Sequence, residues 1–420
     1  MDKVYIKYID IERIRHLHNI ELILDANEKS NDFKHILFTG KNGSGKTSVL
    51  NAIEKQLSNI CQVKDFFSLD RRIKGAESAL FFAKGSNQRV DEINKAEEDL
   101  SFWNKKKSEY YSGISLSFNC DEHGLRGRFE KGEFILAYFK AERTFDAIVP
   151  RHVEKVKLKS HYMIEDDPRK DFIKYLVDKK VSQSLYASEK NKEQANRLAA
   201  WFDSFEKMLK KIFEDESLRL EFDVKDFSFK ILEDGREPFD FGTMADGYAA
   251  VLDIVVGIMM RMEAVSSDVF MFDMPGIVLI DELETHLHYE MQKKVLPFLC
   301  SVFPNVQFII STHSAFILNS VENAVIYDLE NGKLIQNGLA NLPYEGIIKG
   351  YFEVDSLSRE LREKFDRYRE IVTKKNITDA DIAEIPELEL YLDEIPDYLA
   401  LGVTTEYRRL KAEFEKREDL

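Results

Sequence analysis

The chain has 420 residues, of which 44% are hydrophobic, and a formal net charge of −15 at pH 7. This length can hold one large domain or two ordinary ones, and the apolar fraction is normal for a protein with a sizeable core. Because a protein that coats nucleic acid over its whole surface would be basic, the charge disfavours a dedicated DNA binder and leaves room only for a local basic patch.

The sequence pattern also disfavours a membrane protein and a secreted protein. No stretch approaches the roughly 18 uncharged apolar residues of a membrane helix, and the N-terminal residues carry charge where a signal peptide has an apolar core. We therefore expect a cytoplasmic protein without a membrane partner. Cys61, Cys120 and Cys300 form no CxxC pair, which fits neither a disulfide framework nor a zinc site; each is expected to be a buried apolar residue.

The N-terminal third begins with strands. Residues 4–24 alternate apolar and polar side chains and predict two strands with a short connection. Residues 33–39 predict a strand that runs into a glycine-rich turn, and Thr47–Ile60 has the apolar spacing of a helix. Residues 62–112 are charged and polar and suggest an insertion, with a helix at Asp91–Tyr111.

The middle of the chain changes character twice. Residues 113–149 return to strand character, in segments at 114–118 and 133–139. Residues 151–215 are helix-prone and rich in lysine, and residues 219–232 alternate as in a pair of strands.

The C-terminal half again alternates helices and strands. A long helix is expected at 247–263, and it is followed by a strand at Gly276–Ile280, a helix at Tyr289–Phe303 and a strand at Val306–Ser311. This order predicts a largely parallel sheet with helices on its faces. The last 70 or so residues look helical and acidic, with Pro386 and Pro396 as interruptions.

These segments suggest the following domains. An N-terminal lobe at 1–150 contains the insertion at 62–112, a lysine-rich helical insertion follows at 151–218, a C-terminal lobe occupies 219–345, and an acidic helical tail covers 346–420.

The glycine-rich turn carries a phosphate-binding motif. Residues 40–47 read GKNGSGKT and match GxxxxGK[ST] at every fixed position. Glycines let the N–H groups of such a loop turn inward around a phosphate, and the following helix adds its positive N-terminal end. Lys46 is expected to neutralise the outer phosphates and Thr47 to bind Mg²⁺. The candidate nucleotide-binding residues here are Gly40, Asn42, Gly43, Ser44, Gly45, Lys46, Thr47 and Ser48.

A pair of acids ends the predicted strand Gly276–Ile280. A strand buried on both faces has no use for carboxylates unless they reach a site at its tip. In a P-loop fold the first acid holds Mg²⁺ through water and the second polarises the attacking water. Asp281 is therefore the candidate metal residue and Glu282 the candidate base, with a helix-capping acid as the alternative.

Histidines follow the last two predicted strands. His286 and His288 stand beside acids, but no third ligand cluster supports a metal site, and residues two apart on a helix face apart; a helix cap or a subunit contact is expected. His313 follows Val306–Ser311 and could hydrogen-bond a γ-phosphate. A histidine at a strand end is more often structural, but its place about 30 residues after Glu282 favours the site.

In this order the motifs resemble those of the ABC/SMC superfamily of P-loop ATPases. The Asp-Glu pair followed by His-Leu-His, with Ser-Thr-His-Ser after the next strand, is similar to RecF-like and OLD-like prokaryotic members over residues 1–50 and 240–330. The resemblance implies an α/β fold: an ABC-type ATPase head with a mostly parallel sheet flanked by helices, an N-terminal antiparallel β part and a helical insertion.

The resemblance also implies roles for further residues. Asp246 and Gly247 occupy the position of the family's signature motif, in which Ala245 replaces the usual serine. The lost hydroxyl weakens ATP-driven closure of a dimer, while Gly247 and the helix N-terminus still offer N–H groups. His313 matches the switch histidine. Arg143 is similar to a strand-end arginine of OLD-like ATPases and is a candidate nucleotide contact, with a surface arginine as the alternative.

By the same resemblance the chain hydrolyses ATP with Mg²⁺, and Glu282, Lys46 and His313 are its catalytic residues. Family members hold two ATP molecules between two heads, so we expect a head-to-head dimer or a higher oligomer in which residues 283–286 touch the partner subunit. No nuclease is recognised, since Asp379-Ala-Asp381 has the letters of a Toprim motif but lacks a flanking apolar strand.

An ATPase of this type without its own effector resembles the sensor subunits of bacterial anti-phage systems such as Septu, PARIS and some retrons. This implies a scaffold that restrains a separate nuclease or toxin, with residues 151–215 or 352–420 as contact surfaces unless these are merely solvated faces. The competing class is a RecF-like DNA-repair or recombination ATPase that binds DNA through the lysines of 151–215 and Lys105, Lys106 and Lys107. An ABC-transporter subunit fits less well because of the insertion, the His-Leu-His run and the altered signature.

Overall fold

A computed structural model describes most of the chain. The described residues are 3–24, 33–85, 90–143, 145, 148, 150, 152–266, 270, 272–336, 338–340, 359–374, 377–393 and 401–414. They form two compact units, residues 1–341 and 342–420.

A six-stranded sheet forms the centre of the first unit, in the order β12-β11-β3-β10-β9-β5. Five of its strands are parallel and β12 is antiparallel to β11. The strands are β3 (His35–Thr39), β5 (Ile135–Phe139), β9 (Gly276–Ile280), β10 (Val306–Ser311), β11 (Ala324–Asp328) and β12 (Lys333–Ile335). Strands β3, β9, β10 and β11 are buried along their whole length, as expected of parallel strands covered on both faces.

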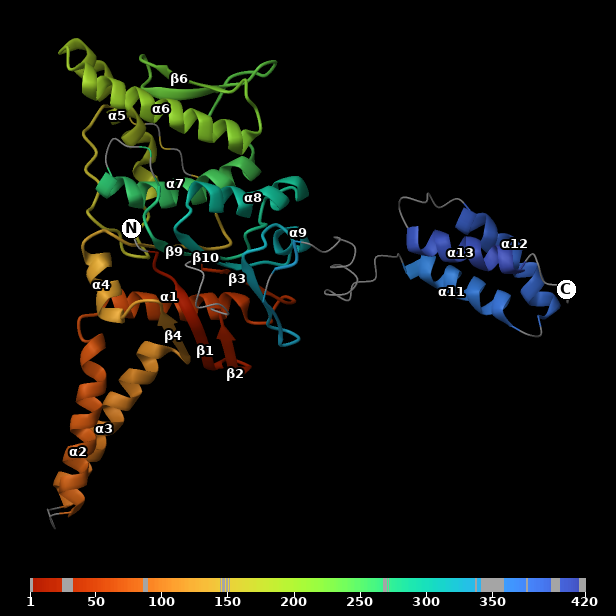
Figure 1. The fold of residues 1–420 in the computed structure, drawn as a ribbon, viewed down its shortest axis with the longest axis horizontal. Coiled ribbons are helices and arrows are strands. Elements are labelled where there is room, and N and C mark those ends of the chain that lie inside the picture. The colour runs from red at the N-terminus through yellow and green to blue at the C-terminus, as the bar shows by residue number, and fades with distance from the viewer. Residues whose placement is uncertain are drawn as a thin grey trace. The chain divides into compact units, whose positions relative to one another are not determined.

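A smaller antiparallel sheet, in the order β2-β1-β4, lies beside the central one (Figure 1). Its strands are β1 (Ile6–Ile14), β2 (Leu17–Ile23) and β4 (Ile114–Phe118). Helix α1 (Lys46–Gln62) buries Leu50, Ile53 and Leu57 in a core shared by both sheets. The strand pair predicted at residues 4–24 and the helix predicted at Thr47–Ile60 are confirmed.

Helices cover the other face of the central sheet (Figure 1). Helix α7 (Asp246–Ser266) packs so closely on β5 that a Cβ atom on Gly257 would lie 2.6 Å from the ring of Phe139. Helix α8 (Tyr289–Val302) lies beside α7 (Figure 1). The rest of this part consists of the 3₁₀ helix η2 (Pro168–Asp171), the helices α5 (Phe172–Ser188) and α6 (Lys192–Phe213), and a sheet of β6 (Arg219–Asp223), β7 (Ser228–Leu232) and β8 (Phe239–Asp240). The fold class predicted from the sequence, an α/β head with a mostly parallel sheet flanked by helices, is confirmed.

A buried carboxylate ties this helical layer together. Glu263 of α7 is 1% exposed and accepts hydrogen bonds from Trp201 Nε1 at 2.6 Å and from the Tyr175 hydroxyl. The Lys179 ammonium lies 3.5 Å from the same carboxylate. A buried charge is tolerated when it is paired and hydrogen-bonded in this way, so the lysine-rich segment is fixed to the head by one of its own lysines.

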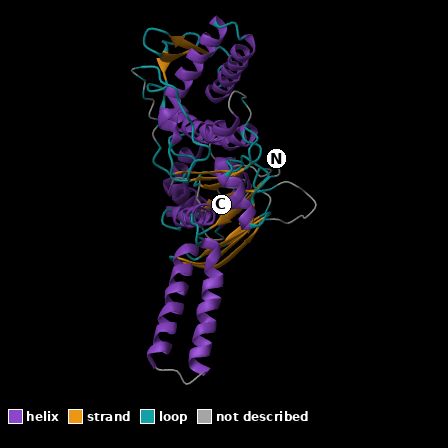
Figure 2. Ribbon diagram, turned by 90° about the vertical axis from the view of Figure 1, so that its left-hand side faces the viewer, coloured by secondary structure: helices purple, strands orange, loops and turns teal. Residues whose placement is uncertain are grey.

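The predicted insertion at 62–112 forms a helical hairpin that projects from the head (Figures 1 and 2). It consists of the short η1 (Phe66–Ser68), α2 (Leu69–Gly85) and α3 (Val90–Tyr111). At its base Asn59 Nδ2 donates to the carbonyl oxygen of Tyr110 at 2.7 Å, which joins α3 to α1.

Several sequence-based expectations were incomplete. The strand-rich segment 113–149 also contains helix α4 (Glu122–Glu130), capped by Asp121, whose carboxylate accepts from Gly124 N at 2.8 Å. Its two glycines and short length hid the helical pattern. A four-residue helix, α9 (Ala315–Leu318), follows β10. Cys61 is buried as expected, but Cys120 and Cys300 are only half-buried; all three are free.

The second unit is a three-helix bundle. Its helices are α11 (Arg359–Thr373), α12 (Asp379–Asp393) and α13 (Leu401–Phe414), with a core around Phe365, Tyr368, Leu388 and Tyr407. Pro386 lies inside α12, so the expected interruption there was wrong; the expectation for Pro396 concerns a residue outside the described part of the chain.

The described helices also bear on the membrane and nuclease expectations. None of them is long and apolar enough to cross a membrane. The Asp379-Ala-Asp381 letters open helix α12, where the Asp381 carboxylate accepts from Thr378 N at 3.1 Å and pairs with Arg367 and Lys374. Asp381 is thus engaged at a helix start.

Candidate ATP-hydrolysing site

The predicted phosphate loop joins the buried end of β3 to the start of α1. Gly40, Gly43 and Gly45 have φ values of +130°, +85° and +101°, a region that side chains with a Cβ atom rarely adopt. A Cβ atom on Gly40 would also lie 2.8 Å from the Ser44 hydroxyl. The glycines of the motif are therefore required by the turn itself.

Lys46 lies at the centre of this loop. It is 5% exposed, and its Nζ donates to the carbonyl oxygens of Gly40 at 2.8 Å and Lys41 at 3.1 Å. Burial lowers its pKa, while the carboxylates of Glu282 and Glu284 oppose the shift. These charges act on Lys46 only because the fold brings the loop next to the acids that follow β9.

Two acidic residues at and just after the end of β11 support the phosphate loop. Glu330, in the turn after β11, lies 2.7 Å from Lys41 Nζ and accepts from Lys41 N at 3.2 Å. Asp328, at the end of β11, accepts from the backbone N–H of Glu330 at 2.9 Å. Sequence reasoning missed both residues; the Asn331-Gly332 turn was the only local signal, and nothing in it indicates a contact with residue 41.

Asp281 and Glu282 leave the tip of β9 in different ways. Asp281 is 4% exposed and accepts a hydrogen bond from the Ser311 hydroxyl, while Glu282 N donates to the same Ser311 oxygen at 2.8 Å. Glu282 has a φ of +47°, a conformation that persists in a non-glycine residue only where surrounding contacts impose it. Ser311, which orients both acids, was not predicted as a site residue.

His313 follows β10, which lies between β3 and β9 in the sheet. Its backbone N–H donates to the Glu284 carboxylate. His313 Nε2 and Glu284 Oε2 are both buried without a hydrogen-bond partner among the described residues. Burial lowers the pKa of His313, and the charge of Lys46 lowers it further. The site thus holds an imidazole whose buried Nε2 has no partner among the described residues.

Arg143 lies close to these residues but is turned toward the protein. It is 5% exposed, and its guanidinium donates to the carbonyl oxygens of Asp281 and Glu282, each at 2.8 Å. This arrangement gives Arg143 a role at the backbone of residues 281–284, the acidic turn that follows β9. The nucleotide contact suggested by the resemblance stays a prediction that these bonds do not favour.

The predicted signature residues lie elsewhere in the unit. Asp246 and Gly247 open α7, and a Cβ atom on Gly247 would lie 3.2 Å from both the His286 carbonyl oxygen and the Met291 sulfur. The nearest neighbours of Gly247 thus belong to the turn after β9 and to α8. His286 has a φ of +67°, and His286 and His288 belong to no cluster of three metal-ligand side chains among the described residues.

The residues of the loop and of the acidic turn fit Mg²⁺-ATP. Ser44 Oγ is buried without a partner among the described residues, no atom lies within 4 Å of a Cβ built on Gly43, and Thr47 is exposed at the first turn of α1. Mg²⁺ keeps most of its ligands as water and phosphate oxygens and needs only one or two from protein, which Thr47 and Asp281 could supply. Asn42 is exposed and Ser48 half-buried, and their contacts with nucleotide stay predictions.

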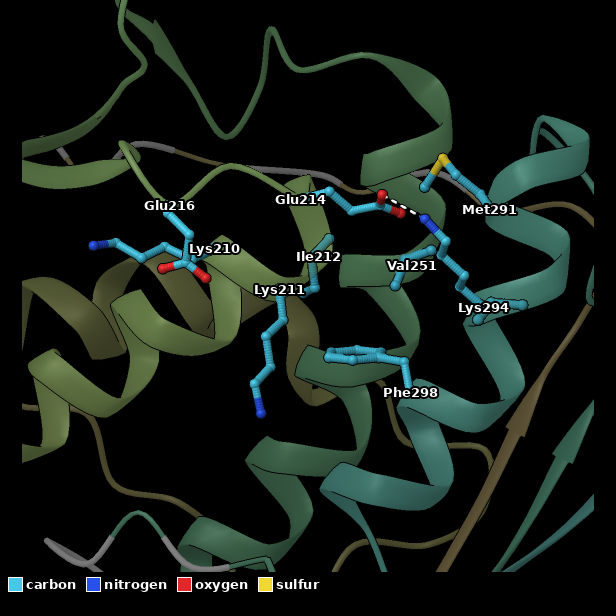
Figure 3. Close-up of a pocket in the computed structure, with 10 residues that line it drawn as sticks. Lys210, Lys211, Ile212, Glu214, Glu216, Val251, Met291, Lys294 and Phe298 are labelled. Carbon is cyan, nitrogen blue, oxygen red and sulfur yellow. Dashed lines mark hydrogen bonds and ion pairs between the residues drawn. The ribbon is translucent and has the colours of Figure 1, made fainter.

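A separate cavity of about 370 Å³ lies where α6, α7 and α8 meet (Figure 3). Its lysines are partly neutralised, since Lys294 lies 2.6 Å from Glu214 and Lys210 lies 3.5 Å from Glu206. None of its lining residues belongs to the phosphate loop or to the acidic turn. They are Lys210, Lys211, Ile212, Glu214, Glu216, Val251, Met291, Lys294, Val295 and Phe298.

Comparison with known proteins finds one matching family model and several sequence relatives. The family model "AAA domain, putative AbiEii toxin, Type IV TA system" matches residues 143–319. The chain is 24% identical over 410 residues to the Septu protein PtuA of Bacillus mycoides, covering 95% of this chain and 52% of that protein. It is 31% identical over 114 residues to "Retron Ec83 probable ATPase" of Escherichia coli, covering 26% of this chain and 21% of that protein.

A DNA-repair protein and solved structures also match. The DNA replication and repair protein RecF of Rickettsia conorii is 24% identical over 203 residues, or 43% of this chain and 52% of that protein. The SMC head domain from Thermotoga maritima is 12% identical, with a TM-score of 0.36 over 78% of this chain and 97% of that chain. The chain spans about half the length, or less, of these curated relatives.

Proposed function

We propose that this chain, an ABC/SMC-like P-loop ATPase related to the Septu and retron ATPases, hydrolyses ATP at the edge of its central sheet where β3, β9 and β10 end. One observation carries the proposal. The charges of Asp281, Glu282 and Glu284 act on Lys46, which is buried in the phosphate loop. The same three carboxylates and Lys46 itself all act on His313. Residues from three separate parts of the sequence thus gather around one point.

Each residue has a role that follows from its position. Lys46 binds the outer phosphates, and Thr47 and Asp281 would hold Mg²⁺, which neutralises developing charge on the phosphates. Glu282 accepts a proton from the attacking water and orients it. His313 would hydrogen-bond the terminal phosphate through Nε2, which has no partner among the described residues.

The test compares ATP hydrolysis and ATP binding in single variants. Glu282→Gln should lower kcat by a factor of about 10²–10⁴, the usual contribution of a general base, and should retain ATP binding. Lys46→Ala should lose ATP binding, because the loop then lacks its cation. Glu237→Gln is the matched control, because Glu237 is exposed and lies outside the phosphate loop and the acidic turn. Hydrolysis by Glu282→Gln at the rate of the unaltered chain would contradict the proposal.

The head is further proposed to act in an assembly. Asp246 is exposed and Gly247 half-buried at the start of α7, which supports a signature surface open to the nucleotide of a second head. The finer proposal is a sensor or scaffold subunit of a bacterial anti-phage complex that controls a separate nuclease or toxin. Its support is the relation to Septu PtuA along 95% of this chain.

A DNA-repair ATPase of the RecF type is the second candidate, favoured by the identity with RecF over 203 residues. Several of the lysines expected to bind DNA already pair with carboxylates of the same chain at the surface, which reduces the local positive charge. Lys155 lies 3.2 Å from Asp178, and Lys159 lies 2.9 Å from Asp166. Lys107 similarly lies 2.8 Å from Asp70.

The same Glu282→Gln variant separates the two candidates. Purified from its native cells, it should retain one stoichiometric protein partner, and added DNA should leave the hydrolysis rate of the unaltered chain flat. Recovery of DNA alone, together with hydrolysis that DNA stimulates and salt suppresses steeply, would favour the repair ATPase.

A further inference from the structure

Arg143 uses almost all of its donors on one backbone turn. Nη1 donates to the carbonyl oxygens of Asp281 at 2.8 Å and Lys140 at 3.3 Å. Nη2 donates to those of Glu282 at 2.8 Å and Leu283 at 3.4 Å. A guanidinium has five N–H donors, so only the Nε hydrogen remains, and Nε is buried without a partner among the described residues.

These bonds explain the unusual backbone at Glu282. Carbonyl groups at the end of a buried strand need donors, and Arg143 supplies donors to three consecutive carbonyls. The left-handed φ of +47° at Glu282 costs a non-glycine residue roughly 1–2 kcal/mol, so it depends on such surrounding contacts. The direction in which the Glu282 side chain leaves the strand therefore depends on Arg143.

A second buried charged group lies on the helix that begins at the predicted signature. Asp253 of α7 is 1% exposed; its Oδ2 accepts from Arg169, and its Oδ1 is buried without a partner among the described residues. Burial lowers the pKa of Arg143, and the charge of Asp253 is the strongest influence opposing that shift. Arg143 Nε and Asp253 Oδ1 are thus a buried donor and a buried acceptor, each without a partner among the described residues, on side chains of opposite charge.

We propose that Arg143 is a positioning residue that couples α7, through Asp253, to the turn Asp281–Leu283 and so sets the orientation of Glu282. The inference rests on the proposed ATP hydrolysis at this site. It assigns Arg143 no contact with nucleotide, because none of its donors faces an open site.

The test is a double-mutant cycle with Arg143→Ala, Asp253→Asn and the combined variant. Arg143→Ala should lower kcat at least tenfold while the affinity for a fluorescent ATP analogue changes less than threefold. Arg143→Lys keeps the positive charge but loses the two nitrogens with which the guanidinium bonds several carbonyl groups. Its kcat should lie between those of Arg143→Ala and the unaltered chain. The combined variant should be no slower than Arg143→Ala alone, because the two side chains act as one unit. Arg197→Ala, at a side chain 52% exposed on α6, is the control and should leave kcat unchanged.

The outcomes that would overturn the inference are distinct. A parallel loss of ATP affinity in Arg143→Lys would make Arg143 a nucleotide contact, and strictly additive effects would remove the coupling to Asp253. The same double-mutant cycle can be measured by thermal unfolding, which needs no hydrolysis. The decrease in Tm of the combined variant should be smaller than the sum of the decreases in the two single variants. A decrease equal to that sum would also overturn the coupling. If the unaltered chain does not hydrolyse ATP, the proposed function fails, and the unfolding cycle still decides the coupling.

Discussion

His35, at the first position of β3, is buried in a place where a protonated, charged imidazole is unfavourable. The side chain is 6% exposed, its Nδ1 accepts from Phe308 N at 3.1 Å, and its Nε2 lies 3.2 Å from Cys300 Sγ. Burial lowers its pKa to about 4 from the ordinary value of 6.5. The imidazole is therefore neutral in the folded protein under conditions in which the unfolded chain would bind a proton.

This difference predicts a loss of stability in mild acid. A group whose folded pKa is depressed stabilises the fold above its unfolded pKa, and the benefit is lost as pH falls toward the folded value. Because each pKa unit corresponds to about 1.4 kcal/mol, the free energy of unfolding should fall by about 2 kcal/mol between pH 7.5 and 5 on account of His35. The measurement is urea unfolding at both pH values.

His35→Asn is the matched variant, since its side-chain oxygen can accept from Phe308 N but does not titrate in this range. Its stability should be lower at pH 7.5 and should fall less toward pH 5 than that of the unaltered chain. Other titrating groups are common to both proteins, so the difference isolates His35. Parallel pH profiles would show that the imidazole is not held neutral.

At the scale of elements, the loop between β3 and α1 depends on backbone shape more than on side chains. Gly40 combines a φ of +130° with a neighbour, Ser44 Oγ, at 2.8 Å from the position of a Cβ atom. Gly75 in α2 offers a contrast, because a Cβ atom there would meet nothing within 4 Å. The two positions separate a glycine required by a turn from one that a helix merely tolerates.

Gly40→Ala should lower ATP affinity at least tenfold, because the loop must distort to admit the methyl group. Gly75→Ala should leave affinity unchanged and raise the free energy of unfolding by about 0.5–1 kcal/mol, the usual gain in a helix interior. Equilibrium binding of a fluorescent ATP analogue and urea unfolding measure the two effects. Unchanged affinity in Gly40→Ala would mean that the loop does not form the phosphate cradle.

At the scale of the whole molecule, the chain divides into two units with separate cores. In the second unit, residues 342–420, the three described helices form a bundle in which Tyr368 is fully buried. Arg367 pairs with Glu384 at 2.8 Å across α11 and α12, and Lys411 pairs with Glu389 at 3.2 Å across α13 and α12. A segment with its own apolar core can in principle fold alone.

The isolated segment 342–420 should therefore show helical circular dichroism and a cooperative thermal transition. Tyr368→Ala should abolish the transition or lower stability by about 3–5 kcal/mol, as for other large buried aromatics. The complementary fragment 1–341 should retain ATP binding, because every predicted nucleotide residue lies within it. A gradual, non-cooperative melt of the unaltered segment would show that its core needs the rest of the chain.

The sequence by itself determined the strongly patterned parts of this protein. The motif at 40–47, the buried runs that became β3, β9 and β10, and the long helices α1, α3, α7 and α8 were all predicted, because loop chemistry, apolar runs and helical spacing are local properties. The short glycine-containing helix α4 and the position of Pro386 inside α12 were missed. In both cases tertiary contacts outweighed a weak or contrary local signal.

Only the tertiary structure decided how the site is supported. Ser311 orients Asp281 and Glu282, Glu330 clamps Lys41, and Arg143 lies on the carbonyls of the acidic turn. These partners lie between 29 and 289 positions apart in sequence. No local pattern encodes them, because hydrogen-bond partners at such separations are fixed by strand order in the sheet, and strand order is a property of the folded chain.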